Sequence, residues 1–356
     1  MQIQKKHPAR KIWFWNKSRQ IALMVLEFLW KWVIRFFYKP DFVFLVYGQE
    51  RHKRACWSIR TERRIGLFGL IGFISYRRSG KKLRGLILAS TISMEQFNSD
   101  PSLAVTVTGE VRKRFPQVRA IALAGQLPGW LVRSTGISPQ QPFVGGMRGT
   151  CFAVRQAVNK IATRFVSHGV KAGPYRSEEL KQLCVAVAGG GGHTGSAVVR
   201  ELAQDYGRVI AFDPRFTEEY QEEIGNVART SYYSQLGEAN MVVVLTAKGD
   251  DAKEMARHLN PGAIVADDTH PMMSKQIRKL FLDRGVRLVK VTVADGSVNM
   301  WPRLPDFKRD DVPGCLLEAL VVKLMGPQVL ESQEAFNLAA EELGFKARLE
   351  AHPDYS

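Results

Sequence analysis

The chain has 356 residues, with 51 Lys and Arg against 34 Asp and Glu, which gives a formal net charge of +17 at pH 7. Its 45% hydrophobic and 24% charged residues are typical of a globular protein and exclude wholesale disorder or collagen-like structure. At about 100–200 residues per domain, this length predicts roughly two domains.

The positive charge is concentrated at one end of the chain. Residues 1–119 contain 24 Lys and Arg and 7 Asp and Glu, whereas residues 120–356 contain 27 of each. The N-terminal third therefore carries the entire excess. Any partner that is recognised by charge is expected to bind there.

The four cysteines are far apart and form no CxxC pair or His/Cys cluster; they are Cys56, Cys151, Cys184 and Cys315. This spacing argues against a disulfide framework and a zinc site, so we expect no metal and a reducing, cytoplasmic compartment. The N-terminal stretch lacks the pattern of a signal peptide.

Residues 1–40 form a segment rich in aromatic and basic side chains. Between Ile12 and Phe37, charged residues interrupt every window of about 18 residues, so a membrane-spanning helix is not expected. Glu27, Lys31 and Arg35 recur every four residues and predict one polar stripe on an otherwise apolar helix. Such a helix fits a membrane interface. Packing on the protein's own core or on a partner subunit is the alternative.

Two basic clusters follow, at residues 51–64 and 77–84. Together with the first segment they predict that residues 1–84 bind an anionic membrane surface, which would make the protein peripheral to the inner membrane face. An acidic acyl carrier protein would be attracted in the same way. Nucleic acid has no supporting motif and is the least favoured partner.

Residues 41–160 are predicted to form an α/β domain that binds substrate. Apolar runs predict strands at 41–47, 86–90 and 118–124. A glycine-rich loop at 143–150 then leads into an amphipathic helix at 151–168. Its residues Gly145, Gly146 and Thr150 could cradle an anion or a substrate; an ordinary turn is the alternative.

Residues 161–305 contain the most specific motif of the chain. An apolar strand at 183–188 runs into a glycine loop and then a helix at 197–206, and Gly190, Gly192 and Gly195 satisfy G-x-G-x-x-G in that context. The glycines permit close approach of the backbone to a pyrophosphate at the helix N-terminus. We expect dinucleotide contacts from Gly189, Gly190, Gly192, His193, Thr194 and Gly195; a turn without a nucleotide is the alternative.

The end of the next strand, at 209–212, bears on the choice between NAD and NADP. Asp213 could accept hydrogen bonds from the adenosine ribose, which favours NAD. Arg215 could instead hold a 2′-phosphate, which favours NADP. The residues leave both cofactors open, with a slight preference for NAD.

Further strands alternate with helices in the rhythm of a Rossmann-like, doubly wound, mostly parallel sheet. The strands are expected at 241–246, 263–266 and 286–293, and the helices near 216–224, 250–258 and 272–283. Ligands bind outside the carboxyl ends of such strands, so Thr246, residues 267–271 and residues 294–297 would line the nicotinamide half of the site. His270 could donate a proton there; a surface histidine is the alternative.

Residues 306–356 are predicted to form C-terminal helices that carry a candidate nucleophile. Pro313 is a start signal for a helix at 316–325, and Cys315 falls in its first turn. A helix N-terminus favours the thiolate form of a cysteine. A buried, inert cysteine is the alternative.

The stretch VPGCLLEALVVKLMG, which contains Cys315, resembles the C-terminal helix of the long-chain fatty acyl-[acyl carrier protein] reductases. The loop VAVAGGGGHTGSAVVREL is similar to the cofactor loop of these aldehyde-forming enzymes. Gly145-Gly146 with Thr150 resembles their substrate loop, and the tail AAEELGF resembles their last helix. Gly146 stands where the family tends to have Asn. The similarity spans roughly residues 41–350.

The resemblance implies a reductase of acyl carrier protein or CoA thioesters that forms fatty aldehydes through an acylated Cys315. Glu318 matches the acidic residue of the family's Cys-x-x-Glu-Ala motif, and the family usually uses NADPH. The C-terminal helices would then pack between the substrate domain and the Rossmann-like domain. Two alternatives stay open: an oxidoreductase resembling shikimate or amino-acid dehydrogenases without covalent catalysis, and a non-enzymatic, membrane-associated dinucleotide sensor.

Overall fold

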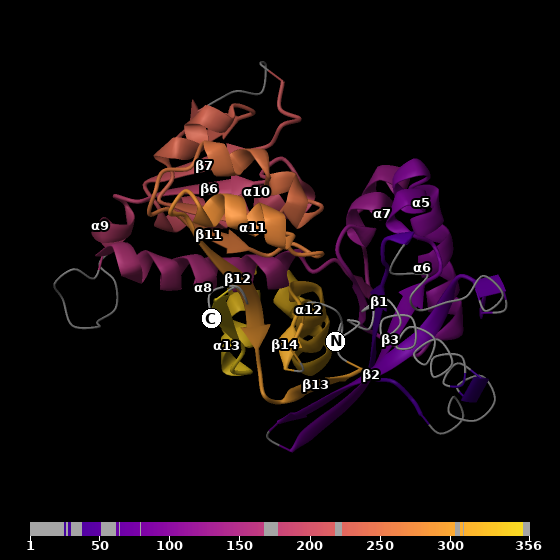
Figure 1. Ribbon diagram of the computed structural model, residues 1–356. Helices are drawn as coiled ribbons and strands as arrows, with labels where there is room; N and C mark the ends of the chain where they lie inside the picture. Colours follow the sequence, from indigo (N-terminus) through magenta and orange to yellow (C-terminus); the bar gives the residue numbers. More distant parts are fainter. Residues whose placement is uncertain are drawn as a thin grey trace, which may run out of the picture. The chain divides into compact units, whose positions relative to one another are not determined.

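Figure 1 shows the protein as a computed structural model that describes most of the chain from Tyr38 to Ala351. The predicted interfacial helix between Ile12 and Phe37 and most of the basic cluster at 51–64 lie outside the described residues. Among the described residues, no helix is both long enough and apolar enough to cross a membrane. The described ranges are 38–50, 65–78, 80–166, 177–217, 223–302, 307–308 and 310–351, with Val25, Phe28, Leu29, Glu62 and Arg63 as isolated positions.

The chain divides into two compact units. Unit 1 comprises Met1–Gly145 and Ser297–Leu304, and unit 2 comprises Gly146–Gly296 and Pro305–Ser356. This division differs from the predicted boundaries at 160 and 305 in two ways. The helix α8 (Met147–Val166) belongs to unit 2 because it packs on helices of that unit, and the segment 297–304 returns to unit 1 as a strand.

Unit 1 is built on a six-stranded mixed sheet with the order β13-β2-β3-β1-β4-β5. β1 lies between β3 and β4 and is parallel to both, whereas β2 and β3 form a long antiparallel hairpin. β13 pairs antiparallel with the outer edge of β2. The bounds are β1 Phe42–Val46, β2 Phe68–Arg78, β3 Lys81–Ser90, β4 Ile121–Leu123, β5 Phe143–Val144 and β13 Val298–Trp301.

The core of unit 1 lies between this sheet and the helices α5 (Met94–Ser99), α6 (Ser102–Arg114) and α7 (Leu127–Thr135). The rings of Phe97 and Trp130 stack with their centroids 4.7 Å apart. This aromatic contact between α5 and α7 is fully buried and contributes to the packing of the helical layer.

Unit 2 is built on a nine-stranded sheet whose central order is β12-β11-β10-β6-β7-β9. These strands are parallel, and the order reverses at β6, so the predicted doubly wound, Rossmann-like fold is confirmed. Every residue of β6 and β10 is buried, which explains their unbroken apolar sequences. The bounds are β6 Cys184–Ala188, β7 Arg208–Phe212, β8 Glu223–Ile224, β9 Val227–Thr230, β10 Met241–Val244, β11 Ile264–Asp267, β12 Arg287–Ala294, β14 Asp311–Val312 and β15 Lys346–Ala351.

The helices of unit 2 place both glycine motifs at helix starts. α10 begins directly in the dinucleotide loop, and α8 begins directly after Gly146, each four residues earlier than predicted. The bounds are α8 Met147–Val166, α9 Ser177–Leu180, α10 His193–Asp205, α11 Lys275–Leu282, α12 Gly314–Met325 and α13 Gln333–Glu342.

One predicted helix of unit 2 was wrong, and a second is not helical where the structure describes it. Of the predicted helix at 216–224, residues 218–222 lie outside the described residues. Phe216 and Thr217 are in no helix or strand, and Glu223–Ile224 form strand β8, which is followed by a turn with Gly225 at a φ of 61° and pairs with β9. A Gly-Asn pair between two short strands is a hairpin signal, and the helical prediction overlooked it. The region 250–258 forms two short 3-10 turns, Gly249–Ala252 and Glu254–Arg257, instead of one α-helix.

Candidate functional site

The glycine loop of unit 2 has the close packing that a dinucleotide-binding turn requires. A Cβ atom at Gly195 would lie 2.0 Å from the carbonyl oxygen of Gly189, and one at Gly190 would lie 2.9 Å from the Cα of Ala211. Gly189 itself has a φ of 88°. The loop therefore tolerates no side chains at these positions, and its backbone passes directly into the N-terminus of α10.

The remaining predicted loop contacts lie in the first turn of α10. Gly192 is the N-cap residue and provides no side-chain cap for the helix. His193 is exposed and Thr194 is half-buried. An N-terminus in this state presents backbone N–H groups and the positive end of the helix dipole to an anion.

Asp213, at the carboxyl end of β7, is buried against the glycine loop and bound by Arg215. The guanidinium of Arg215 donates from Nε to Oδ1 at 2.9 Å and from Nη2 to Oδ2 at 2.7 Å, and the backbone N–H of Arg215 also donates to Oδ1. Burial acts to raise the pKa of Asp213, but these bonds and one from the N–H of Gly191 outweigh it and lower the pKa. The chain's own donors thus occupy the carboxylate that was predicted to accept the ribose hydroxyls. The side chain of Arg215 is 72% exposed.

The carboxyl ends of β10 and β11 carry the predicted lining of the nicotinamide half. Thr246 is half-buried and donates its hydroxyl to the carbonyl of Lys248 at 2.8 Å. His270 is exposed and stacks on Phe307 with the ring centroids 4.3 Å apart. His270 thus lies at this edge of the sheet, but at its exposed surface.

Asp268 is a residue of this edge that the sequence did not single out. Removal from water, together with the neighbouring charge of Asp267, raises the pKa of Asp268 to about 8, and Lys290 opposes the shift only in part. Asp267 is buried and accepts from the N–H and the hydroxyl of Thr269 at 2.9 and 2.6 Å. An adjacent pair of acidic residues at a strand end was visible in the sequence, but its burial was not.

The start of α8 is capped by Glu318, which lies in α12. Oε2 of Glu318 accepts from the backbone N–H of Arg148 at 2.8 Å and from that of Gly149 at 3.3 Å. Burial raises the pKa of Glu318, while the N–H groups of Gly149, Gly146 and Arg148 oppose that rise. This side chain therefore satisfies the first turn of α8 and positions the two helices relative to each other.

The helices α8 and α12 approach each other at glycines. A Cβ atom at Gly149 would lie 2.0 Å from the carbonyl oxygen of Gly314, and one at Gly314 would lie 2.5 Å from Oγ1 of Thr150. A Cβ atom at Gly146 would lie 2.5 Å from both Cα and Cβ of Cys315. The structure thus brings Gly146, Thr150, Cys315 and Glu318 together within unit 2. It also explains why Gly146 has no side chain.

Cys315 is half-buried in the first turn of α12, whereas Cys151 and Cys184 are buried. Pro313 is the N-cap of α12 and has no side-chain acceptor, so no N-cap side chain binds the first N–H groups of α12. The first turn of α8, in contrast, is capped by Glu318. Burial raises the pKa of the Cys151 thiol to about 12 and that of Cys184 to about 11. Among the described cysteines, Cys315 is the one with exposed surface.

Cys315 lies at the carboxyl edge of the sheet of unit 2. β11 pairs with β12 up to Asp267 and Lys290, and β15 occupies the other edge of β12. β14 pairs with Val293 and Ala294 of β12, on the same side as β11 and just beyond its carboxyl end. Pro313 and the start of α12 follow β14 directly. They therefore lie near the carboxyl ends of the parallel strands, where ligands bind in open α/β sheets.

Contacts between α8 and α10 place the start of α8 on the same side of the sheet as the dinucleotide loop. Arg155 of α8 forms a two-pronged ion pair with Asp205 of α10, and Asn159 accepts from the hydroxyl of Tyr206. Earlier in α8, Cys151 lies within the electrostatic influence of Glu201. Residue numbers increase together along both helices, so α8 and α10 are parallel and their N-termini point the same way.

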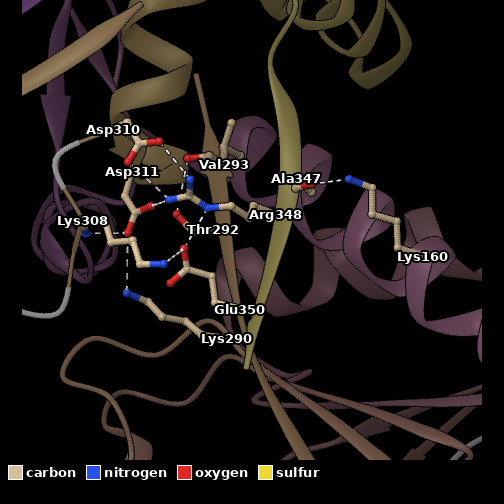
Figure 2. A network of polar contacts seen from close by, with 10 residues as sticks. All are labelled: Lys160, Lys290, Thr292, Val293, Lys308, Asp310, Asp311, Ala347, Arg348 and Glu350. Carbon is tan, nitrogen blue, oxygen red and sulfur yellow. Dashed lines mark hydrogen bonds and ion pairs between the residues drawn. The ribbon is translucent and has the colours of Figure 1, made fainter. Parts of the chain in front are cut away.

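A polar network fixes the short strand that precedes Cys315 (Figure 2). Arg348 of β15 pairs with Asp310 and with the fully buried Asp311 of β14. The N–H of Lys308 donates to Asp311 at 2.6 Å, and Nζ of Lys290 lies 4.0 Å from the same carboxylate. Because Asp311 is only four residues before Cys315, this network sets the path of the chain into α12. It was not anticipated, because its members are scattered along the sequence.

No family model and no curated protein matches the chain. Among solved structures, it is similar to shikimate 5-dehydrogenase from Listeria monocytogenes in complex with shikimate and NAD, with 14% identity, coverage of 70% of this chain and 86% of that chain, and a TM-score of 0.35. A D-isomer specific 2-hydroxyacid dehydrogenase family protein from Klebsiella pneumoniae 342 matches with 13% identity, coverage of 82% and 95%, and a TM-score of 0.32.

The D-isomer specific 2-hydroxyacid dehydrogenase from Xanthobacter autotrophicus Py2, in complex with NADPH, matches with 21% identity and a TM-score of 0.29. That match covers 40% of this chain and 64% of the other, so the chain spans less than two thirds of that protein's length. These similarities are to dehydrogenases and give no support to the acyl-[acyl carrier protein] reductase family specifically. The fold class rests on the strand order of this chain itself.

Proposed function

We propose that the protein is an NAD(P)H-dependent oxidoreductase that reduces fatty acyl thioesters, carried by CoA or an acyl carrier protein, to aldehydes through an acyl intermediate on Cys315. The observation that carries this proposal is the placement of Cys315. It lies half-buried in a first turn without a side-chain cap, at the carboxyl edge of a Rossmann-like sheet and on the side of the glycine loop.

The residues present fit a nicotinamide dinucleotide. The loop from Gly189 to Gly195 leaves no room for a Cβ atom at its tightest points, and the N-terminus of α10 provides backbone donors for a pyrophosphate. Arg215 and Asp213 would lie at the adenosine end, and Thr246 and Asp268 would lie toward the nicotinamide end. When bound, the dinucleotide supplies a hydride.

Cys315 acts in this proposal as the nucleophile. Its thiolate adds to the thioester carbonyl carbon, the bond between that carbon and the donor sulfur breaks, and the donor thiol leaves after taking up a proton. Backbone N–H groups in the first turn of α12 stabilise the negative charge on the carbonyl oxygen. After hydride addition at the same carbon, its bond to the sulfur of Cys315 breaks, which releases the aldehyde and restores the thiolate.

Glu318 is a positioning residue in this mechanism. Its carboxylate is bound to the N–H groups of α8, so it holds Gly146 against Cys315 instead of exchanging protons with a substrate. His270 is exposed at the same sheet edge, where as an imidazolium it could donate the proton that the leaving thiolate takes up.

A second candidate is a dehydrogenase of alcohol or carbonyl substrates that needs no cysteine. The observation that favours it is Asp268, because a carboxyl group with a pKa of about 8 at the carboxyl end of β11 can exchange a proton near neutral pH. In that reaction Asp268 or His270 is the acid–base group, and Cys315 is dispensable.

Incubation with acyl-CoA or acyl carrier protein thioesters and NADH or NADPH, followed by aldehyde quantification, tests the first proposal. We expect Cys315→Ala to abolish aldehyde formation and Cys184→Ala to retain it. Mass spectrometry of the native chain without reduced cofactor is expected to detect an acyl adduct on Cys315. Undiminished aldehyde formation by Cys315→Ala would refute the covalent route. Turnover of hydroxy or keto acids with no adduct would favour the second candidate.

A further inference from the structure

The outer half of the β2–β3 hairpin extends beyond the rest of its sheet. β1 pairs with β3 only from Gly85 to Ala89, and β13 pairs with β2 only from Phe73 to Tyr76. The pairing of β2 with β3 continues outward to Arg78 and Lys81. At its base the N–H of Arg77 donates to the carbonyl of Ser297, and the N–H of Arg84 donates to the carboxylate of Asp41. Beyond these two residues the described hairpin continues as two strands, and we call residues 77–84 the basic arm (strands β2 and β3 in Figure 1).

The basic arm places positively charged residues directly opposite one another on its two strands. Arg77 lies opposite Lys82 and Arg78 lies opposite Lys81, and Arg84 follows two residues after Lys82. Like charges directly across an antiparallel pair destabilise that pair. Two strands without a further neighbour are already only marginally stable in water. The arm thus carries a repulsion that a bound anion would relieve.

No acidic residue occurs close by in the sequence. Residues 63–94 contain seven Lys and Arg and no Asp or Glu. Arg77, Lys81 and Lys82 are exposed, and among the described residues no carboxylate pairs with any of these three. The charge of these three side chains is therefore presented to solvent.

The distribution of cations over the arm indicates the shape of the partner. Side chains alternate between the two faces of a strand, so Arg77, Lys82 and Arg84 lie on one face and Arg78 and Lys81 on the other. A protein docked on one face would reach only part of this set. A layer of anionic head groups that receives the arm end-on reaches cations on both faces at once.

We propose that the basic arm docks the protein on an anionic lipid surface. The attraction is electrostatic, because the last paired residues before the turn, Arg78 and Lys81, are charged and offer no apolar side chain for insertion. It therefore depends on the anionic lipid content and weakens with salt. This proposal is independent of the reaction that unit 2 catalyses.

Flotation of the full chain with vesicles tests the proposal. The vesicles are made of phosphatidylcholine alone or of phosphatidylcholine mixed with phosphatidylglycerol. We expect partitioning onto the mixed vesicles only, and loss of it in high salt. The triple variant Arg77→Gln, Lys81→Gln, Lys82→Gln should partition about a hundredfold more weakly, from about 1 kcal/mol for each cation near the surface.

A matched variant removes the same charge elsewhere. Lys275→Gln, Lys279→Gln, Arg284→Gln neutralises three exposed cations of unit 2, on and after α11, and should change the partition coefficient by less than about threefold, because none of these cations belongs to the basic arm. Circular dichroism and thermal melting verify that both variants are folded.

Several outcomes would overturn the proposal. These are equal binding of the native chain to neutral and mixed vesicles, binding of the basic-arm variant as tight as that of the native chain, and an equal loss in the matched variant. Failure to bind mixed vesicles while binding soluble polyglutamate would assign the arm to an acidic protein instead. Since the readout is partitioning, none of these outcomes depends on thioester reduction.

Discussion

Oε2 of Glu318 accepts the backbone N–H of Arg148 at 2.8 Å, across 170 residues of sequence. The same oxygen accepts from Gly149, so one carboxylate of α12 completes the first turn of α8. This contact and the glycine approach beside it define how the glycine loop before α8 meets Cys315.

Replacement of Glu318 tests the cap. We expect Glu318→Ala to lower the free energy of unfolding by about 1–3 kcal/mol, because the N–H groups of Arg148 and Gly149 lose their acceptor. Glu318→Gln retains a side-chain oxygen and should cost less. Urea unfolding monitored by circular dichroism measures both. A cost for the Gln variant equal to that for the Ala variant would contradict the assignment of the oxygen as the cap.

Gly149 tests the close approach of α8 and α12. Gly149→Ala adds a Cβ atom 2.0 Å from the carbonyl oxygen of Gly314, so the helices must separate, and we expect a loss of about 1–3 kcal/mol. Gly109→Ala is the matched control, because Gly109 lies in helix α6 with nothing within 4 Å of its added Cβ. That control should stabilise by about 0.5–1 kcal/mol. Changes in the free energy of unfolding that have the same sign for both variants would argue against the close approach of α8 and α12.

Asp268 predicts a specific dependence of stability on pH. Burial and Asp267 raise its pKa from 3.8 to about 8, so the folded state favours the neutral carboxyl group more strongly than the unfolded state does. The stabilisation is full below pH 3.8 and is lost as the pH rises through about 8.

Asp268→Asn removes this titration. The unfolding free energy of the native chain, relative to that of Asp268→Asn, should fall as the pH rises from 5 to about 8, because over this range the unfolded state has lost the proton that the folded state retains. It should level off once the folded carboxyl group is charged as well. Asp283→Asn removes an exposed carboxylate and controls for the loss of a charge. A difference that stays constant over this range would show that Asp268 is ionised throughout.

Arg215 predicts the choice between the two cofactors. The guanidinium of Arg215 donates to both carboxylate oxygens of Asp213. The expected ribose end of the site therefore presents an exposed guanidinium and not a free carboxylate. We expect Arg215→Ala to weaken NADPH binding at least about tenfold more than NADH binding, which corresponds to about 1.4 kcal/mol. Fluorescence titration measures both dissociation constants, with Arg284→Gln as the control. An equal loss for the two cofactors would contradict this role.

Local patterns were sufficient to predict the core of unit 2. The alternation of buried strands and helices, and the glycines between Ala188 and Ala197, depend on neighbours in the sequence. The meeting of Gly146 with Cys315 does not. Glycines that pack against another helix leave no periodic signal, and only the family resemblance placed these residues in one site.

Other features of the fold could not be predicted from the sequence, because the strands concerned are rich in charged residues or very short. The outer part of β2 and β3 reads as a basic cluster, because Arg and Lys occupy positions where a strand is usually apolar. β14 has two residues, and its position depends on Arg348 and Lys290, which lie far away in the sequence. The elevated pKa of Asp268 results from burial, which a pair of acidic residues in a sequence does not indicate.

β13 has a consequence for any attempt to divide this protein. Because Ser297–Leu304 belongs to unit 1, the chain passes between the units three times, and neither unit is one continuous stretch. A fragment that ends at Gly145 would lack β13 and would leave the edge of β2 from Phe73 to Tyr76 without its partner strand. Unpaired edges recruit other chains, so we expect such a fragment to self-associate. Joining the β13 segment to it through a short linker should restore a monomer.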